Sequence, residues 1–328
     1  MNLRHMWWKI AALRTPGDVL EAVDSAIKPY YYPWAQRWNK GVFAIEFHNP
    51  KMGFFAKLNW CLFILHYCER NGLVPYLELT SENYVSHQRG RDWFKYYFNN
   101  LALRNKGYDE SFRPKHVTRV RNISELRLPG WCYHELSLEH AAELFRHNIG
   151  VRPEISAEVD DYCEKYFSSR TVLGVHFRGT DKAIEAPRVT WGYCRETILN
   201  YLHAHPDIDA LFVTSDEAAF IHYIREHFTD ITVLSRDDHF RSDGTAPLHV
   251  LGSGGDNYLK GVDALVNSLL LSRCSTIVRS SSFLSAWASI FNPAVPVILL
   301  NKPHESAMWF PEVRIMERSL DKYLPDAG

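Results

Sequence analysis

The residues between 171 and 182 combine a strand-like apolar run with a dense group of polar side chains. The run Thr171 to Val175 is typical of a buried strand, and it leads into His176-Phe177-Arg178-Gly179-Thr180-Asp181-Lys182. Because side chains in a strand alternate, His176 and Arg178 should share one face. An arginine at the end of a buried strand is costly unless an anion meets it, and open α/β sheets bind ligands at that end. We therefore predict an anion site, with an internal Arg–Asp pair as the weaker alternative.

Two later strand ends carry polar groups of the same kind. Asp216 would accept hydrogen bonds from a ribose, steady Arg178, or cap the helix expected over 217–227. Three serines, Ser280, Ser281 and Ser282, stand between a predicted strand and a predicted helix. The first amides of a helix carry its positive dipole end, so with these hydroxyls they would form an anion cradle. Capping needs one serine, and we predict that the cradle and Arg178 hold a diphosphate without a metal.

An apolar helix predicted over 257–272 carries two acceptors, Asp263 and Asn267. They are four residues apart and hence share one helix face, from which they could read a guanine edge. For Asp263, simple exposure at the helix start is an equal alternative. The Asp207-Ile208-Asp209 triplet has the spacing of metal-dependent sugar transferases, but it precedes its strand and is predicted to be a solvated turn. No residue is predicted to bind a metal.

The elements that must position these side chains alternate regularly in the second half of the chain. This alternation predicts a parallel sheet covered on both faces, and hence an α/β fold. The predicted strands cover 171–178, 210–214, 231–234, 275–279 and 295–300. The helices between them cover 191–204, 217–227, 257–272 and 283–290.

The first half of the chain begins its regular structure with a βαβ unit. Its strands are predicted over 42–47 and 74–79, with a helix over 55–71 between them. A later helix is predicted to begin at Ser156, although its capping box is imperfect. Between these elements, five residues would either line an acceptor cleft or pack as a helix on the domain. They are Arg89, Arg91, Trp93, Tyr96 and Tyr97.

Length and composition limit the number of domains and the classes of function that the chain can have. The 328 residues are enough for two domains, which we place at 1–160 and 161–328, the second with a C-terminal tail. The 37 basic and 38 acidic residues argue against a broad surface for nucleic acid or anionic membranes. Six scattered cysteines indicate reduced, mostly buried thiols and a cytoplasmic protein. The N-terminus would form either a docked helix, which we favour, or a short amphipathic helix giving peripheral membrane association.

Three motifs together resemble those of the α-1,6-fucosyltransferase group, which includes the rhizobial nodulation fucosyltransferases. The run His176 to Lys182 resembles the HxRxTDK-type motif, and Thr214-Ser215-Asp216-Glu217 resembles the second motif. The run from Gly261 to Ser285 is similar to the third, a Leu-Leu-Leu-Ser helix followed by a strand and a serine cluster. The motifs occur in the family's order over about residues 171–290, while the first half matches only loosely.

The resemblance implies a GT-B fold, in which two Rossmann-like domains with parallel sheets face a cleft. It also implies GDP-β-L-fucose as donor, a glycan acceptor, no cofactor or metal, and inversion at the anomeric carbon. Arg178 would bind the β-phosphate, His176 would contact the nucleotide, and Asp216 with Ser281 or Ser282 would complete the pocket. Glu185 is the candidate base, helped by Asp181, with an exposed loop carboxylate as its alternative role.

Two departures from the family pattern bear on the donor. Gly179 stands where relatives often have a second arginine, so that phosphate contact would come from Lys182 or Arg279. The acceptor before Leu-Leu-Leu-Ser is Asn267, and Asp263 would substitute for the usual acid. The prediction is a fucosyltransferase; the alternatives are a transferase using another nucleotide sugar and a nucleotide-sugar-binding protein without turnover.

Overall fold

The computed structural model describes residues 39, 41–50, 52–86, 88–109, 111–126, 128, 136–179, 186–236 and 257–325. The N-terminal segment with its two predicted alternatives lies outside these ranges. Asp181, Lys182 and Glu185 also lie outside them, so their roles stay predictions.

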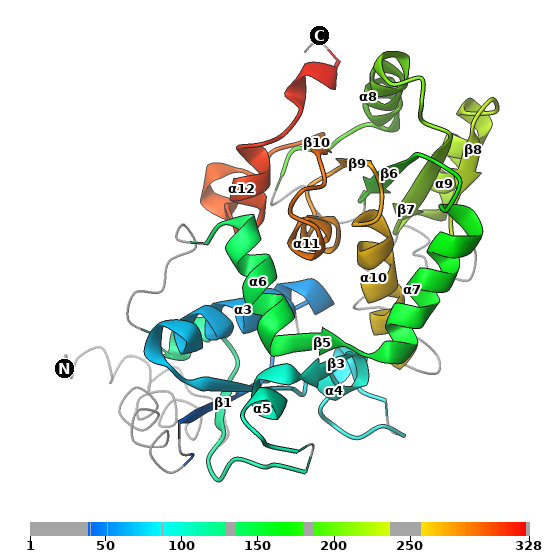
Figure 1. Cartoon of the computed structure of the whole chain (residues 1–328). Helices are drawn as coiled ribbons and strands as arrows, with labels where there is room; N and C mark the ends of the chain where they lie inside the picture. Colours follow the sequence, from blue (N-terminus) through cyan, green and yellow to red (C-terminus); the bar gives the residue numbers. More distant parts are fainter. Residues whose placement is uncertain are drawn as a thin grey trace.

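A three-stranded parallel sheet organises the first half of the chain (Figure 1). Its strands β1 (Val42–Phe47), β2 (Val74–Leu79) and β4 (Thr118–Val120) lie in the order β2-β1-β4. Helix α3 (Phe54–Asn71) links β1 to β2, which confirms the predicted βαβ unit. The helix ends at Gly72, whose φ of 62° places it in the left-handed region that favours glycine.

Shorter elements complete this half. A pair of antiparallel strands, β3 and β5, adds a small second sheet. In chain order the elements are η1 (Glu82–Tyr84), α4 (Phe94–Tyr97), β3 (Phe98–Asn100), α5 (Leu101–Asn105), η2 (Ile123–Leu126), α6 (Leu138–Asn148) and β5 (Ile149–Val151).

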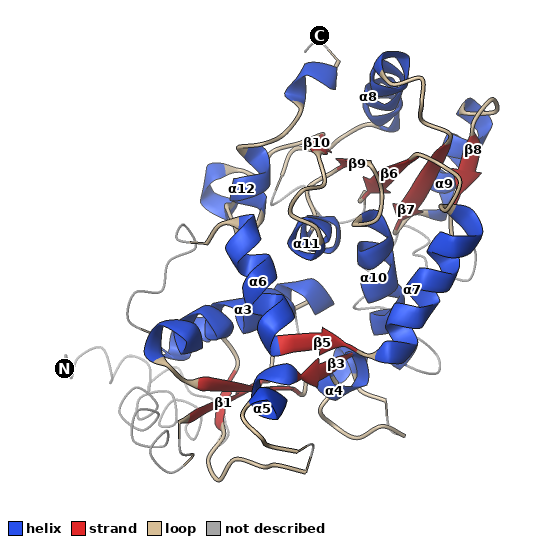
Figure 2. Ribbon diagram, in the orientation of Figure 1, coloured by secondary structure: helices blue, strands red, loops and turns tan. Residues whose placement is uncertain are grey.

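A five-stranded, fully parallel sheet organises the second half (Figure 2). Its strands are β6 (Val172–Phe177), β7 (Ala210–Ser215), β8 (Thr232–Leu234), β9 (Thr276–Arg279) and β10 (Val297–Leu299). The order β10-β9-β6-β7-β8 runs outward in both directions from the β6–β9 pair. That pair is the topological switch point, where open α/β sheets bind ligands at the carboxyl ends of the strands. The structure thus confirms the α/β class and the parallel sheets.

Helices cover both faces of this sheet, as the strand pattern requires. Leu173, Val175 and Phe177 alternate onto one face, where they pack with residues of α8 and α9. The other face receives α10 and α11, and Gly174 lies on it. A Cβ at Gly174 would lie 3.1 Å from the Cys274 Sγ atom, so glycine lets the end of α10 approach closely. The helices are α7 (Pro153–Tyr166), α8 (Trp191–Ala204), α9 (Ala218–His227), α10 (Asn257–Leu271) and α11 (Phe283–Phe291).

The start of α7 differs from the prediction. The helix begins at Pro153 and not at Ser156, and no side chain caps it. Proline fits the first position of a helix because its missing N–H has no intrahelical partner there. The capping box predicted at Ser156 is therefore wrong. The predicted domain boundary at 160/161 falls within this helix and stays a prediction.

The two halves share one hydrophobic core and are joined by buried hydrogen bonds. The Asn59 side-chain amide donates to the Phe310 carbonyl at 2.8 Å. The Tyr97 hydroxyl donates to the Tyr258 carbonyl at 2.9 Å, and the two rings stack. The C-terminal residues beyond β10, with η4 (Glu305–Ala307), α12 (Glu312–Met316) and η5 (Asp321–Tyr323), return to cover both halves.

Gly261 on α10 allows this contact between the halves, and its replacement tests the packing. A Cβ there would overlap the Tyr97 hydroxyl and lie 2.8 Å from its Cε1 atom. Alanine normally favours a helix by about 1 kcal/mol over glycine, so Gly261→Ala should stabilise if the contact were loose. We expect it instead to lower the free energy of unfolding by about 1–3 kcal/mol, measured by denaturant titration. Gly192→Ala on α8, where a Cβ meets only Thr190 Oγ1 at 3.9 Å, is the control and should be neutral or stabilising.

Most of the described cysteines are buried free thiols, as the sequence predicts. The five cysteines in the described ranges are free thiols, and four are buried: Cys61, Cys68, Cys194 and Cys274. Burial raises the pKa of each of these four thiols. None of the helices in the described ranges is long and apolar enough to cross a membrane.

Candidate functional site

Three loops meet at the carboxyl edge of the five-stranded sheet. The register pairs His176 of β6 with Thr214 of β7 and with Arg279 of β9. Because these strands are parallel, the residues that follow them emerge at one edge. The structure therefore brings the three polar strand ends predicted from the sequence to one place.

Backbone hydrogen bonds fix the loop that carries Arg178. Its N–H donates to the Ser280 hydroxyl at 2.8 Å, and the Ser280 N–H donates to the His176 carbonyl at 3.0 Å. On the other side, the Gly179 N–H donates to the Asp216 carboxylate at 3.4 Å. Asp216 thus steadies the Arg178 loop, whereas the N-cap of α9 is Glu217, so the capping role considered for Asp216 is wrong.

His176 is a neutral imidazole at the centre of this edge. Its side chain is almost fully buried. Burial, followed by the charges of Arg279 and Arg178, holds its pKa well below the usual range. Its Nδ1 atom has no hydrogen-bond partner among the described residues. A neutral ring nitrogen in this position can exchange a hydrogen bond with a ligand.

The Ser282 hydroxyl and the Asn267 side-chain carbonyl oxygen also lack hydrogen-bond partners; with His176 Nδ1 they are three of twelve such buried side-chain atoms in the described part of the chain. Unsatisfied buried polar atoms are rare in folded proteins and call for a reason. Ser282 is the N-cap of α11 but makes no side-chain capping bond, so its hydroxyl stays available beside the positive end of that helix. All three atoms belong to residues that the sequence predicted to bind the ligand.

The other two serines are engaged within the protein. The Ser280 hydroxyl accepts the Arg178 N–H, and the Ser281 N–H donates to the Asn301 side chain at 2.7 Å. Both contacts fix the backbone of the loop between β9 and α11, and the role of the three serine hydroxyls in an anion cradle stays a prediction.

Arg279 has a structural role that excludes it as the missing phosphate ligand. Its guanidinium binds both carboxylate oxygens of Glu312 at 2.6 and 3.0 Å and also donates to Ser285 Oγ at 2.8 Å. Arg279 and Glu312 are both completely buried. The suggestion that Arg279 contacts a phosphate is thus wrong, because its donors are already directed at an internal anion.

Glu217 explains why position 179 holds a glycine. A Cβ at Gly179 would overlap the Glu217 carboxylate and lie 2.7 Å from its Oε2 atom. That carboxylate accepts a hydrogen bond from Trp191 Nε1 at 3.3 Å, and burial followed by Asp216 raises its pKa. An arginine at position 179 would have to displace Glu217.

Asp263 and Asn267 differ in their surroundings on α10. Asp263 lies 3.5 Å from the Arg236 guanidinium, which also pairs with Glu158 of α7 at 2.5 Å. Asn267 is buried. Asp263 helps to hold α7 against α10, and the prediction that Asn267 reads a base stays a prediction. The Asp207 and Asp209 side chains are exposed before β7, as predicted for a solvated turn.

Arg178 also approaches the first half of the chain. Its guanidinium lowers the pKa of the Tyr84 hydroxyl, although burial dominates and raises that pKa to about 12. Tyr84 belongs to η1, which follows β2, and its hydroxyl accepts the Phe54 N–H at 2.9 Å.

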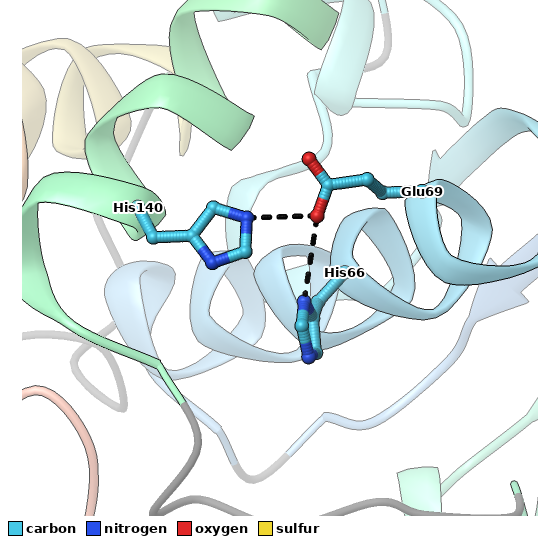
Figure 3. A group of neighbouring side chains, drawn as sticks. All are labelled: His66, Glu69 and His140. Atoms are coloured by element: carbon cyan, nitrogen blue, oxygen red, sulfur yellow. Dashed lines mark hydrogen bonds and ion pairs between the residues drawn. The ribbon is translucent and has the colours of Figure 1, made fainter.

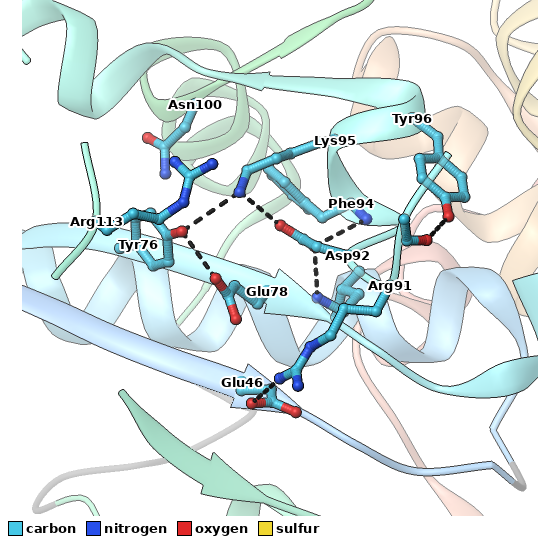
Figure 4. Close-up of polar contacts among 12 residues, drawn as sticks. Glu46, Tyr76, Glu78, Arg91, Asp92, Phe94, Lys95, Tyr96, Asn100 and Arg113 are labelled. Carbon is cyan, nitrogen blue, oxygen red and sulfur yellow. Dashed lines mark hydrogen bonds and ion pairs between the residues drawn. The ribbon is translucent and has the colours of Figure 1, made fainter. Parts of the chain in front are cut away.

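A second polar network lies at the carboxyl edge of the first sheet, and Figure 4 shows its Glu46–Arg91 pair. The buried Glu46 carboxylate accepts from Arg91 at 2.8 Å and from the Thr80 hydroxyl at 2.8 Å, and lies 3.1 Å from Arg119 Nε. His48, which follows β1, is 3.2 Å from the same Thr80 hydroxyl. Two arginines share one carboxylate here, so the edge presents exposed cationic groups.

Five residues were predicted either to line an acceptor cleft or to pack as a helix, and the structure separates them into two groups. Trp93, Tyr96 and Tyr97 are buried and pack in the core. Arg91 reaches the sheet edge, and the Arg89 guanidinium stacks on the Tyr258 ring at 3.8 Å. The aromatic residues support the packed-helix reading, and only the arginines are placed to face a ligand.

Lys57 on α3 is a completely buried lysine in the first half of the chain. Its ammonium donates to the Ser81 hydroxyl and lies 5.5 and 5.3 Å from the Tyr84 and Trp93 rings. Burial lowers its pKa to about 7. The sequence does not predict that Lys57 is buried, because a lysine inside an amphipathic helix usually reaches water.

The depressed pKa of Lys57 predicts a pH-dependent stability. Between pH 7 and the unfolded value of 10.5, the unfolded state binds the extra proton, so the free energy of unfolding rises with pH. Below pH 7 both states are protonated and the contribution is flat. Lys57→Met should remove a slope of up to about 1.4 kcal/mol per pH unit, measured by denaturant titrations at pH 7 to 10. Equal slopes in the two proteins would show that the aromatic rings keep Lys57 charged.

Fold and site together define an α/β protein in which three polar strand ends lie at one edge of a parallel sheet. The family model described as nodulation protein Z (NodZ) matches residues 128–311, more than half of the chain. The chain belongs to the NodZ family.

Individual relatives agree with this assignment. Nodulation protein Z of Bradyrhizobium diazoefficiens is 27% identical over 176 residues, covering 50% of this chain and 46% of the relative. The protein of the same name from Azorhizobium caulinodans is 30% identical over 175 residues, covering 49% of each chain. The chain thus spans about half the length of the curated relatives it matches.

Solved structures of fucosyltransferases also align with this chain. NodZ α-1,6-fucosyltransferase soaked with GDP-fucose aligns with a TM-score of 0.48 at 19% identity, covering 78% of this chain and 94% of that one. A variant of Arabidopsis thaliana FUT1 in complex with GDP aligns with a TM-score of 0.49 at 13% identity, covering 86% of this chain and 76% of that one.

Proposed function

We propose that this chain is a fucosyltransferase that transfers L-fucose from GDP-β-L-fucose to a glycan hydroxyl, with inversion and without a metal. The observation that carries the proposal is that the family match spans the carboxyl edge formed by β6, β7 and β9. A solved member of the family is named an α-1,6-fucosyltransferase and was soaked with GDP-fucose.

The chemistry of the edge fits a nucleoside diphosphate. Departure of GDP builds negative charge on the β-phosphate, which needs preorganised donors. The Arg178 guanidinium, on a loop fixed through its backbone, would supply a bidentate donor. The Ser282 hydroxyl and the positive end of α11 would receive a second phosphate oxygen.

The remaining roles follow from the same placement. The neutral His176 ring would hydrogen bond the nucleotide through Nδ1, and Asn267 would read the base. Glu185 is proposed as the base that deprotonates the acceptor hydroxyl, with Asp181 assisting and Lys182 as a further phosphate contact. Residues 1–160 would bind the glycan and residues 161–328 the donor, in a GT-B arrangement.

A comparison of nucleotides tests the donor directly. GDP at a hundredfold excess over its Kd should stabilise the protein by about 2.7 kcal/mol, which is a rise in Tm of several degrees. UDP at the same concentration should have a much smaller effect, and Asn267→Leu should reduce the preference for GDP. A larger shift with UDP would instead favour a transferase with another donor.

The alternative is a protein that binds the nucleotide sugar without turnover. It would fit the glycine at position 179, where the family resemblance implies a second arginine, and the pairing of Arg279 with Glu312, which removes Arg279 as a phosphate ligand. Release of GDP from GDP-fucose with and without candidate glycans separates the two. Acceptor-dependent release supports the transferase, whereas tight binding without release would support a nucleotide-sugar-binding protein.

A further inference from the structure

A cluster of two histidines and a glutamate joins α3 to α6, apart from the residues assigned to the donor (Figure 3). His66 and Glu69 lie one turn apart on α3, and His140 lies in the first turn of α6. The His140 Nε2 atom is 2.7 Å from Glu69 Oε2, and His66 Nδ1 is 3.7 Å from the same oxygen. In the described part of the chain this is the group of three whose ligand atoms lie within 4.8 Å of one another.

We propose that His66, Glu69 and His140 form a zinc site that staples α3 to α6. Two imidazoles and one carboxylate are a ligand set typical of Zn²⁺, which completes a tetrahedron with water. With bonds of about 2.0–2.1 Å, neighbouring ligand atoms of a tetrahedral zinc lie about 3.3 Å apart. The distance from Glu69 Oε2 to His140 Nε2, 2.7 Å, is shorter than this value, and the distance to His66 Nδ1, 3.7 Å, is longer. Small rotations of the side chains would therefore bring the atoms into place without moving the helices.

The surroundings suit a metal that arrives from solvent. The exposed fractions are 15% for the His66 side chain, 35% for His140 and 49% for Glu69, so the cluster has a path to water. The centroids of the two imidazole rings are 5.3 Å apart and the ring planes are at 85°, so the edges of both rings lie close to the Glu69 carboxylate. For His140 to bind through Nε2, its proton must move to Nδ1, as ordinary histidine tautomers allow.

The role of this metal would be structural. Its ligands come from residues separated by 71 positions in the chain, and they cross-link two helices that pack together. Because α6 also packs against α11, the staple would hold the first half of the chain against the second. None of the three residues contributes to the edge around Arg178.

Zn²⁺ titration of protein without a histidine tag, after dialysis against EDTA, tests the proposal. Isothermal titration calorimetry should show one Zn²⁺ site in the wild type, and Zn²⁺ should raise Tm by several degrees. Glu69→Gln and His140→Ala should each weaken the affinity by at least about tenfold and remove the Tm shift. Mg²⁺ should have no such effect, because it prefers oxygen ligands.

The matched control is His222→Ala on α9, where His222 Nε2 lies 3.1 Å from Glu226 Oε1 in a similar histidine–carboxylate pair. Zn²⁺ binding should be unchanged in this variant. Glu69→Gln is nearly isosteric, so it keeps the test valid if His140→Ala unfolds the protein. Absence of Zn²⁺ binding to the wild type would overturn the proposal, as would equal binding to Glu69→Gln and the wild type.

Discussion

Replacing Arg178 with alanine should reduce fucose transfer by about a hundredfold to a thousandfold while leaving the fold intact. The guanidinium is the only group of the β6 loop in the described residues that can offer two parallel donors to a phosphate, and loss of such donors costs about 10²–10³ in turnover. The fold should survive because the loop is held by the Arg178 backbone N–H, which alanine retains. Initial rates of GDP release with saturating acceptor measure the effect, and thermal unfolding reports the fold.

Two further variants sharpen this prediction. Arg178→Lys keeps the charge but not the planar fork, so its activity should lie between those of the wild type and the alanine variant. Arg170→Ala removes an exposed arginine at the opposite end of β6 and should leave transfer unchanged. Full activity in Arg178→Ala would remove this residue from the mechanism.

The largest loss of stability is expected from Glu312→Gln. This change leaves the Arg279 guanidinium completely buried without its counter-charge. Breaking a buried ion pair from one side costs about 3–5 kcal/mol, because an uncompensated charge remains in the interior. Denaturant titration should show this loss in the free energy of unfolding.

The exposed pair of Lys302 and Asp321, at 2.9 Å, provides the control. Asp321→Asn should change stability by no more than about 1 kcal/mol, because solvent screens exposed charges. The double variant Arg279→Met/Glu312→Leu should recover part of the loss by removing both charges together. A Glu312→Gln protein as stable as the wild type would show that Arg279 finds another partner.

The five-stranded sheet could be predicted from the sequence because its strands alternate with helices and both carry strong apolar patterns. Helix α8 was predicted with its observed bounds, and the three polar strand ends do meet at one edge. The start of α7 was missed because an imperfect capping box at Ser156 was preferred to the proline at Pro153.

The misassignment of Arg279 has a different cause. The rule that pointed to a ligand for Arg178, that a buried arginine at a strand end needs an anion, applies equally to Arg279 at the end of β9. Its anion is Glu312, which lies 33 residues later in a five-residue helix that no motif marks. Pairings across such separations, like that of Glu46 with Arg91, depend on the tertiary fold and leave no local pattern in the sequence.

Incubation with GDP-β-L-fucose, EDTA and a panel of glycans, followed by mass spectrometry of the glycans, tests the central claim most directly. We predict that at least one glycan gains a single fucose together with release of GDP, and that Arg178→Ala forms no such product. If no glycan gains fucose while GDP-fucose still binds, or if product forms equally with Arg178→Ala, the account of this edge as the transfer site is contradicted.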